Sequence, residues 1–176
     1  MTLKKTSIDA YNHDKIDLHQ QDLLDLKFMR LALKQAELSE KIGEVPIGAL
    51  IVDKNGKILS KSTNIREKIK STLGHAELVA IHRACQRLDS WRLIDCTLYV
   101  TLEPCFMCAG ALVQSRIARV VYAARDPKAG ALHSLHELGN DKRLNHRFAV
   151  TSGILAEESS SMLKNFFRKK RKTILP

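Results

Sequence analysis

Residues 103–108 read Glu103-Pro104-Cys105-Phe106-Met107-Cys108, and the rest of the chain is expected to be arranged around this short stretch. Proline is favoured in the first turn of a helix, because its missing N–H would have no partner there. In a helix that begins here, the two sulfurs lie on one face of the first turn. Free N–H groups and the positive end of the helix dipole stabilise thiolates at that position, and thiolates bind metal. The stretch therefore predicts two ligands of a metal site.

The remaining groups of the site are expected from His75-Ala76-Glu77, at the head of a stretch with helical spacing. Positions i and i+2 do not share a helix face, so we place His75 at the helix entry and Glu77 in its first turn. Three protein ligands and an open position for water are typical of a catalytic zinc, whereas a structural zinc has four ligands. We expect His75, Cys105 and Cys108 to bind one zinc ion, with the Glu77 carboxylate beside the water.

A lone Cys-x-x-Cys pair also occurs in redox proteins and in zinc ribbons. A ribbon needs a second pair of ligands, but Cys85 and Cys96 are eleven positions apart, and we expect both to pack in the core. A thioredoxin-like redox motif usually follows a strand within a βαβ unit, and for that reason we favour the redox alternative less. His-x-Glu together with Pro-Cys-x-x-Cys is much more specific, because this combination is the known signature of zinc nucleobase deaminases.

The composition predicts one globular domain. The 176 residues, 44% of them hydrophobic, are enough for a substantial core. Residues 1–21 lack apolar periodicity and are expected to form a poorly ordered extension before a zinc-dependent domain over residues 22–172. The first residues have no apolar segment of a secretory signal, and no apolar run approaches the roughly 18 residues of a membrane span. Because four cysteines without such a signal indicate a reducing compartment, we expect a cytoplasmic protein with no membrane partner.

The net charge is +10, from 29 Lys and Arg against 19 Asp and Glu, which indicates an acidic partner such as nucleic acid. Six cations lie near the C-terminus, at Lys164, Arg168, Lys169, Lys170, Arg171 and Lys172. Phe166 and Phe167 lie among them. Aromatic rings stack on bases while cations meet phosphates, so this segment favours a single-stranded RNA loop. A solvated helix end with both rings in the core is the alternative.

Helices and strands are expected in alternation. From Asp22, a helix is predicted by a largely apolar stripe, interrupted by Arg30, of Leu23, Leu26, Leu33 and Leu38, with Ala32 and Ala36. Asn55-Gly56 predicts a hairpin turn, residues 66–73 a loop, and residues 125–146 a long loop with a short helix around 133–138. The other expected elements are strands 47–52, 57–62, 97–101, 119–123 and 148–151, and helices from His75, over 105–115 and over 155–171. This order predicts a three-layer α/β sheet.

From about Lys27 to Arg171 the chain resembles the bacterial tRNA-specific adenosine deaminases of the cytidine deaminase superfamily. Beyond the zinc motif, the matching stretches are Glu44-Val45-Pro46-Ile47-Gly48-Ala49, Asn64, Arg92-Leu93-Ile94-Asp95, Thr97 to Ala111, Ser115-Arg116-Ile117, Ala124-Arg125-Asp126, Asn145-His146-Arg147, Gly153-Ile154-Leu155-Ala156 and Phe166-Phe167-Arg168. The resemblance implies a five-stranded mixed sheet in an α/β/α cytidine-deaminase-like fold, a homodimer with one zinc per subunit, and conversion of the wobble adenosine of tRNA to inosine.

The resemblance also implies site residues. Zinc would be bound by His75, Cys105 and Cys108, and Glu77 would shuttle protons. Asn64 would contact the flipped-out base, and the loop at Asp126 and the C-terminal helix, including Phe166 and Arg168, would contact the anticodon stem-loop. No DNA partner is expected. The chain departs from the family at Ser71-Thr72, where an Asp-Pro pair is usual, and at His133, where glycine is usual.

The reaction explains these residue types, because water must attack an aromatic carbon at neutral pH. Zinc lowers the pKa of bound water from 15.7 to about 7. Glu77 would take the water's proton, protonate the ring nitrogen, and later protonate the departing ammonia. Two alternatives stay open at this point: a deaminase of a free base or nucleoside of the cytosine, cytidine or guanine type, and a zinc-stabilised RNA-binding module without activity.

Overall fold

The computed structural model of the chain describes residues 7–174, and the side chains of residues 20–172. Five strands form one mixed sheet in the order β2-β1-β3-β4-β5. β1 (Gly48–Val52) is antiparallel to β2 (Ile58–Thr63) and to β3 (Thr97–Leu102), whereas β4 (Arg119–Ala124) is parallel to β3 and to β5 (Ala149–Ser152). The prediction of a five-stranded mixed sheet is confirmed.

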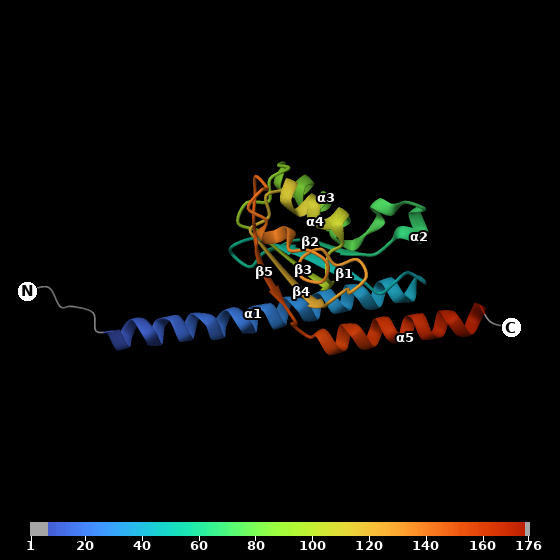
Figure 1. Ribbon diagram of the computed structural model, residues 1–176, viewed down its shortest axis with the longest axis horizontal. Helices are drawn as coiled ribbons and strands as arrows, with labels where there is room; N and C mark the ends of the chain where they lie inside the picture. The colour runs from blue at the N-terminus through green and yellow to red at the C-terminus, as the bar shows by residue number, and fades with distance from the viewer. Residues whose placement is uncertain (1–6, 175–176) are drawn as a thin grey trace, which may run out of the picture.

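Helices cover both faces of the sheet, which gives three layers (Figure 1). α1 (Ser7–Lys41) and α5 (Ala156–Ile174) lie along one face, and α3 (Ala76–Leu88) and α4 (Phe106–Gln114) lie on the other. Each face has its own buried cluster. The strand residues Leu50, Val52, Tyr99 and Val121 pack toward α1, and their neighbours Ala49, Ile51, Leu98 and Val120 pack toward α3 and α4.

The long connections contain short helices that differ from the predictions. The segment predicted as a loop over residues 66–73 forms α2 (Arg66–Ile69) and a 3-10 turn, η1 (Thr72–Gly74). Its polar, basic sequence has no apolar face, and none of the residues of α2 is buried. The short helix predicted around 133–138 lies later, as η2 (Leu138–Asn140). The predicted turn at Asn55-Gly56 is present, with Gly56 at φ +78°.

The buried face of α1 overlaps the predicted stripe only in part. Leu23 and Leu38 are 54% and 45% exposed, whereas an adjacent face buries Asp25, Phe28, Met29, Ala32, Ala36 and Ser39. Ala32 and Ala36 are inward as predicted, but the prediction was wrong for Leu23, Arg30 and Leu38, because the inward face includes a carboxylate, which apolar periodicity excludes. Asp25 is stabilised there by a bidentate bond from Arg119, at 2.8 and 2.6 Å, and by the hydroxyl of Tyr99 at 2.8 Å.

α1 also begins earlier than the predicted start at Asp22, since its backbone is helical from Ser7. Residues 1–6 of the predicted extension lie outside the described residues, and the division of the chain at residue 21 stays a prediction. Among the described helices, none is both long and apolar enough to cross a membrane.

The sheet places three chain segments at one edge. The carboxyl ends of the parallel strands β3 and β4 lead into α4 and into the loop at Asp126, and β2 ends at Asn64. The N-terminus of α3 lies near the same edge, because the hydroxyl of Ser62, near the end of β2, donates to the carbonyl of Ala76 at 2.6 Å. Carboxyl ends of strands and N-termini of helices are where α/β folds usually form their sites.

Candidate active site

His75 and the two cysteines meet at the starts of α3 and α4. His75 is the residue before the first turn of α3, Cys105 is the residue before the first turn of α4, and Cys108 lies within α4. Nδ1 of His75 lies 3.5 Å from Sγ of Cys108 and 3.7 Å from Sγ of Cys105. The three ligand atoms all lie within 4.8 Å of one another. The structure thus brings together the three predicted ligands.

These distances fit a tetrahedral metal site. With Zn–N near 2.0 Å and Zn–S near 2.3 Å, a tetrahedral zinc separates nitrogen from sulfur by about 3.6 Å. Both observed distances lie within 0.1 Å or so of that value. All four cysteines of the chain are free thiols, so the Cys105–Cys108 pair is not a disulfide. The nitrogen-and-sulfur donor set is one that zinc prefers.

The charge at the two sulfurs also favours a cation. A hydrogen bond from the Cys108 thiol, supported by one from His75, lowers the pKa of Cys105 to about 4. The same bond to Cys105, together with burial, raises the pKa of Cys108. These opposite shifts favour a thiolate at Cys105 that accepts a hydrogen bond from the thiol proton of Cys108. A divalent cation would replace that proton and allow both sulfurs to be thiolates.

Glu77 lies in the first turn of α3, beside the three ligands, and is 4% exposed. Burial raises the pKa of its carboxyl group, and the nearby His75 opposes the rise. A carboxyl group with a raised pKa next to a metal site can both accept and return a proton near neutral pH.

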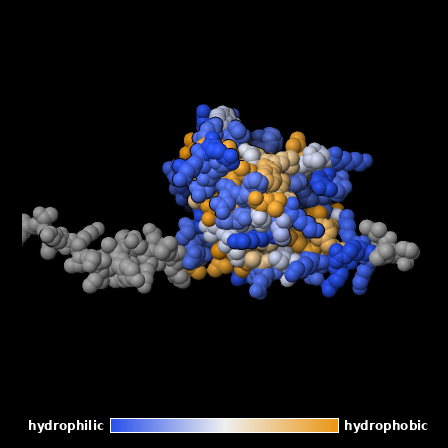
Figure 2. Space-filling view, in the orientation of Figure 1, coloured by the Kyte–Doolittle hydropathy of each residue, from blue (hydrophilic) through white to orange (hydrophobic). Residues whose placement is uncertain are grey.

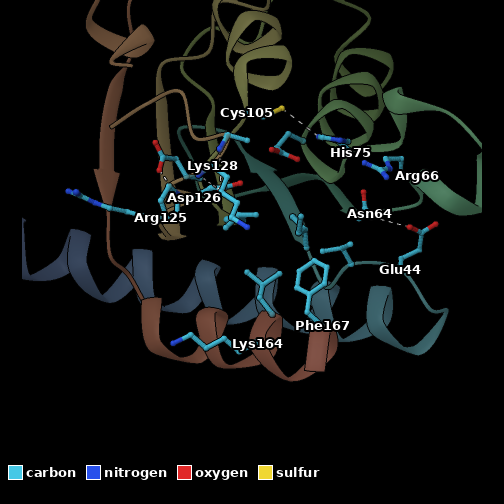
Figure 3. A pocket seen from close by; sticks show the side chains of 18 of the residues that line it. Glu44, Asn64, Arg66, His75, Cys105, Arg125, Asp126, Lys128, Lys164 and Phe167 are labelled. Carbon is cyan, nitrogen blue, oxygen red and sulfur yellow. Dashed lines mark hydrogen bonds between the residues drawn. The ribbon is translucent and has the colours of Figure 1, made fainter. Parts of the chain in front are cut away.

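A cavity of about 850 Å³ lies in front of this cluster (Figure 3). His75, Glu77 and Cys105 line its inner part, and Asn64 and Asp126, both predicted as substrate contacts, line its walls. The remaining lining residues are Glu44, Val45, Ile47, Arg66, Glu67, Leu102, Glu103, Arg125, Pro127, Lys128, Ala129, Leu163, Lys164, Phe167 and Arg171. The cavity is large enough for a nucleotide and has five basic residues around it.

Phe166 and Arg168, the other two predicted contacts, are not brought to this cavity. Phe166 is 5% exposed and packs between α5 and α1, so its ring cannot stack on a base. Arg168 is exposed and donates to Asn165 at 3.0 Å. Phe167, which is 44% exposed, takes the place predicted for Phe166 (Figure 3). Hydrophilic residues cover the C-terminal part of α5, at the lower right of Figure 2.

Glu103 organises the loop that carries Asp126, a role that was not predicted from the sequence. Its carboxylate is 2% exposed and accepts the backbone N–H groups of Asp126, Leu132, His133 and Ser134, and also the Ser134 hydroxyl. Burial would raise the pKa of this carboxyl, but the hydrogen bonds outweigh burial and lower it. One sequence signal existed: an acid placed directly before the proline of the metal motif.

The two departures from the family pattern have local partners. Ser71 precedes η1, and its side chain accepts the N–H of Leu73. This is the capping bond that the aspartate of an Asp-Pro pair could also make. His133 lies with Nδ1 2.6 Å from the hydroxyl of Tyr122. Neither residue contacts the three metal ligands.

Comparison with known proteins agrees with this geometry. The family model of MafB19-like deaminases matches residues 24–171. A tRNA-specific adenosine deaminase of Bacillus subtilis (strain 168) is 49% identical over 148 residues, which cover 84% of this chain and 91% of the relative. The chain belongs to the tRNA-specific adenosine deaminase family. A further member, from Rickettsia bellii (strain RML369-C), is 49% identical over 144 residues, 81% of this chain and 99% of the relative.

Two solved structures have the same fold as this chain. A structure from work on A-to-I editing by tRNA:A34 deaminases at the wobble position of transfer RNA matches with a TM-score of 0.75 and 40% identity. The match covers 78% of this chain and 99% of that one. A structure bound to 8-azaguanine matches with a TM-score of 0.70 at 24% identity and supports the fold alone. The predicted cytidine-deaminase-like fold is confirmed.

Proposed function

We propose that this deaminase converts adenosine to inosine at the wobble position of a tRNA anticodon, using one zinc ion per chain. The observation that carries the proposal is the triangle of His75, Cys105 and Cys108, with the buried Glu77 beside it, at the inner end of a cavity with a basic rim. Relatives named tRNA-specific adenosine deaminase support the choice of substrate.

Zinc would be held by the imidazole and the two sulfurs, whose spacing fits its tetrahedral geometry. When bound, zinc supplies Lewis-acid chemistry that makes a water molecule a nucleophile at neutral pH. The chain's own task is to place that water and the adenine ring together, and to exclude other water. The cavity holds the ring close to the water, and the burial of Glu77 keeps other water away from its carboxylate.

Glu77 moves the protons of the reaction. Its carboxylate takes a proton from the attacking water and delivers it to N1 of adenine, which makes C6 more electrophilic. As the C6–N6 bond breaks, the same carboxylate takes the proton of the new C6 hydroxyl and passes it to the departing amine, so the C6 carbonyl forms and ammonia leaves. Adenosine and water thus give inosine and ammonia, with Glu77 returned to its starting state. His75 and the cysteines hold their positions throughout.

The rim of the cavity would bind the anticodon loop. Arg66 lies on one side, Arg125 and Lys128 on the loop after β4, and Lys164 and Arg171 on α5. Cations placed on several sides of a cavity can contact the phosphates on both sides of an extruded nucleotide. The exposed ring of Phe167 can stack on a neighbouring base. Asn64 and Asp126 would contact the extruded nucleotide and its neighbours, and Arg168 a phosphate farther out.

Two further parts of the proposal concern assembly, which the family resemblance implies, and location. The zinc-dependent domain over residues 22–172 would act as a homodimer, and the protein would work in the cytoplasm, where its tRNA substrate is made. Light scattering of the purified chain tests the dimer, and a mass of one chain would refute it.

The test is incubation of the purified protein with an anticodon stem-loop that has adenosine at the wobble position, followed by nucleoside analysis for inosine. We expect inosine from the stem-loop and little product from free adenosine, cytidine, cytosine or guanine. Product from a free base or nucleoside, and none from RNA, would instead identify a small-molecule deaminase.

A further inference from the structure

The side-chain amide of Asn64 is held by one carboxylate, that of Glu44. Nδ2 of Asn64 donates to Oε2 of Glu44 at 3.0 Å, and Oε1 of Glu44 accepts the backbone N–H of Lys68 at 2.7 Å. Glu44 is 1% exposed and Asn64 is 5% exposed. Water therefore competes little for these bonds.

The backbone of Asn64 is fixed as well. Its N–H donates to the carbonyl of Ile47 at 2.9 Å, and its carbonyl accepts the hydroxyl of Ser39 at 3.0 Å. With both backbone groups of Asn64 anchored, one ambiguity is left for its side chain. It is the 180° rotation of the amide, which exchanges Nδ2 and Oδ1.

Glu44 decides that orientation. An ionised carboxylate only accepts hydrogen bonds, so a rotated amide would set Oδ1 against Oε2 with no proton between them. Nδ2 therefore faces Glu44, as the dashed line in Figure 3 indicates, and Oδ1 faces elsewhere. In the described part of the chain every buried side-chain nitrogen or oxygen has a hydrogen-bond partner. Since no described residue donates to Oδ1, that oxygen is open to the cavity that Asn64 lines.

We propose that Glu44 is a positioning residue for the deamination: it fixes the Asn64 amide so that a carbonyl oxygen meets the substrate. This inference rests on the proposed function, in which Asn64 touches the extruded nucleotide. A hydrogen-bond acceptor at this point favours a donor of the substrate, either the exocyclic amine or the ribose 2′-hydroxyl. It disfavours an unprotonated ring nitrogen, which is itself an acceptor. In this role Glu44 acts on the substrate through Asn64.

A purely structural role would leave Glu44 with one task, to hold α2 through the N–H of Lys68. Glu44→Gln separates the two roles, because the new amide keeps an oxygen for Lys68 but turns a nitrogen toward Nδ2 of Asn64. Two donors then face each other, and the Asn64 amide has to rotate and present Nδ2 to the cavity. A structural role predicts no change in kcat/KM on this substitution.

The positioning role predicts that Glu44→Gln lowers kcat/KM on the anticodon stem-loop about tenfold, the scale of one misplaced hydrogen bond. Bound zinc per chain should stay the same, because no metal ligand changes. Glu37→Gln is the matched control, since Glu37 is an exposed glutamate on α1 and should leave kcat/KM unchanged.

The reciprocal double variant gives the sharper test. In Glu44→Gln with Asn64→Asp, the introduced amide donates to one oxygen of the introduced carboxylate and accepts from Lys68. The second carboxylate oxygen then faces the cavity as an acceptor. We expect this variant to recover most of the lost kcat/KM. Asn64→Asp alone sets two carboxylates against each other and should be less active than both Glu44→Gln and the double variant.

A substrate with 2′-deoxyadenosine at the target position distinguishes the two donors. The effect of Glu44→Gln disappears on it if the donor is the hydroxyl, and persists if the donor is the amine. The inference is overturned if Glu44→Gln is as active as the unchanged chain, or if the double variant is no better than Glu44→Gln. Failure of the proposed function is a different result, because the unchanged chain would then give no inosine.

Discussion

The carboxylate of Glu103 occupies the space that a side chain at Gly130 would need. A Cβ built on Gly130 would contact Cδ and both carboxylate oxygens of Glu103. The same carboxylate accepts the N–H of Asp126 at 3.0 Å and that of His133 at 2.7 Å. Glycine at position 130 therefore allows Glu103 to fold the loop that carries Asp126 over the cavity.

We predict that Gly130→Ala lowers the free energy of unfolding by about 2 kcal/mol, because the displaced carboxylate leaves buried N–H groups without an acceptor. Deamination of the stem-loop should fall with it, since Asp126 moves. Urea unfolding and inosine formation measure the two effects. Gly110→Ala is the control: nothing lies within 4 Å of its Cβ position in α4, so it should stabilise the protein by about 0.5–1 kcal/mol.

The ion pair of Asp25 with Arg119 predicts a loss of stability in acid. Burial would raise the pKa of Asp25, but the bonds from Arg119 and Tyr99 outweigh it and lower the pKa below 3.8. A carboxyl whose pKa is lower in the folded state stabilises the fold above its unfolded pKa, and this stabilisation is lost as the pH falls through the folded value. Glu103 contributes in the same direction.

Asp25→Asn should therefore reduce the slope of the free energy of unfolding below about pH 4, without abolishing it. At neutral pH this variant should be less stable by about 3 kcal/mol, because it leaves the charge of Arg119, whose side chain is 21% exposed, without its partner. Urea titrations at pH 3, 4 and 7 would measure both effects. If the free energy of unfolding has the same pH slope in the variant and in the unchanged chain, the lowered pKa of Asp25 is contradicted.

Cys105→Ala and Cys108→Ala should each remove the zinc ion and lower the melting temperature, because the metal ties the starts of α3 and α4 together. Elemental analysis of the purified variants measures the metal directly. Cys85→Ala serves as the control, since Cys85 lies outside the ligand cluster and should keep about one zinc per chain. Full occupancy in both ligand variants would reject the site.

The neighbouring rings of α5 should separate RNA binding from stability. Phe167→Ala removes an exposed ring at the cavity and should weaken stem-loop binding about tenfold, the scale of one base–aromatic stack, with little effect on unfolding. Phe166→Ala removes a buried ring and should cost about 3 kcal/mol of stability. Fluorescence anisotropy and thermal melting measure the pair. The opposite assignment of effects would restore the contact predicted for Phe166.

The cluster of His75, Cys105 and Cys108 could be predicted from sequence because its members lie at helix starts with local signals. Pro104 marks the start of the cysteine helix, and the spacing of Cys105 and Cys108 places both sulfurs on one face. The strands could be predicted equally well, since β1 is buried along its whole length and its sequence is an apolar run. These features depend on residues that are close together in the chain.

The parts that could not be predicted depend on partners far apart in sequence. Asp25 is inward because Arg119, 94 positions later, neutralises it. Phe166 is buried because Ser159, seven positions earlier, lies on the same face of α5 and donates to the carbonyl of Thr101 in the sheet. A serine gives no apolar signal, so the inward face of α5 could not be distinguished from the outward one.

The most direct test of the account is the conversion of a wobble adenosine by the chain and by Glu77→Ala, with zinc content measured on the same samples. The account predicts inosine from the unchanged chain, and from the variant a full complement of zinc with a rate at least about 100-fold lower. Near-normal deamination by the zinc-loaded variant would contradict it.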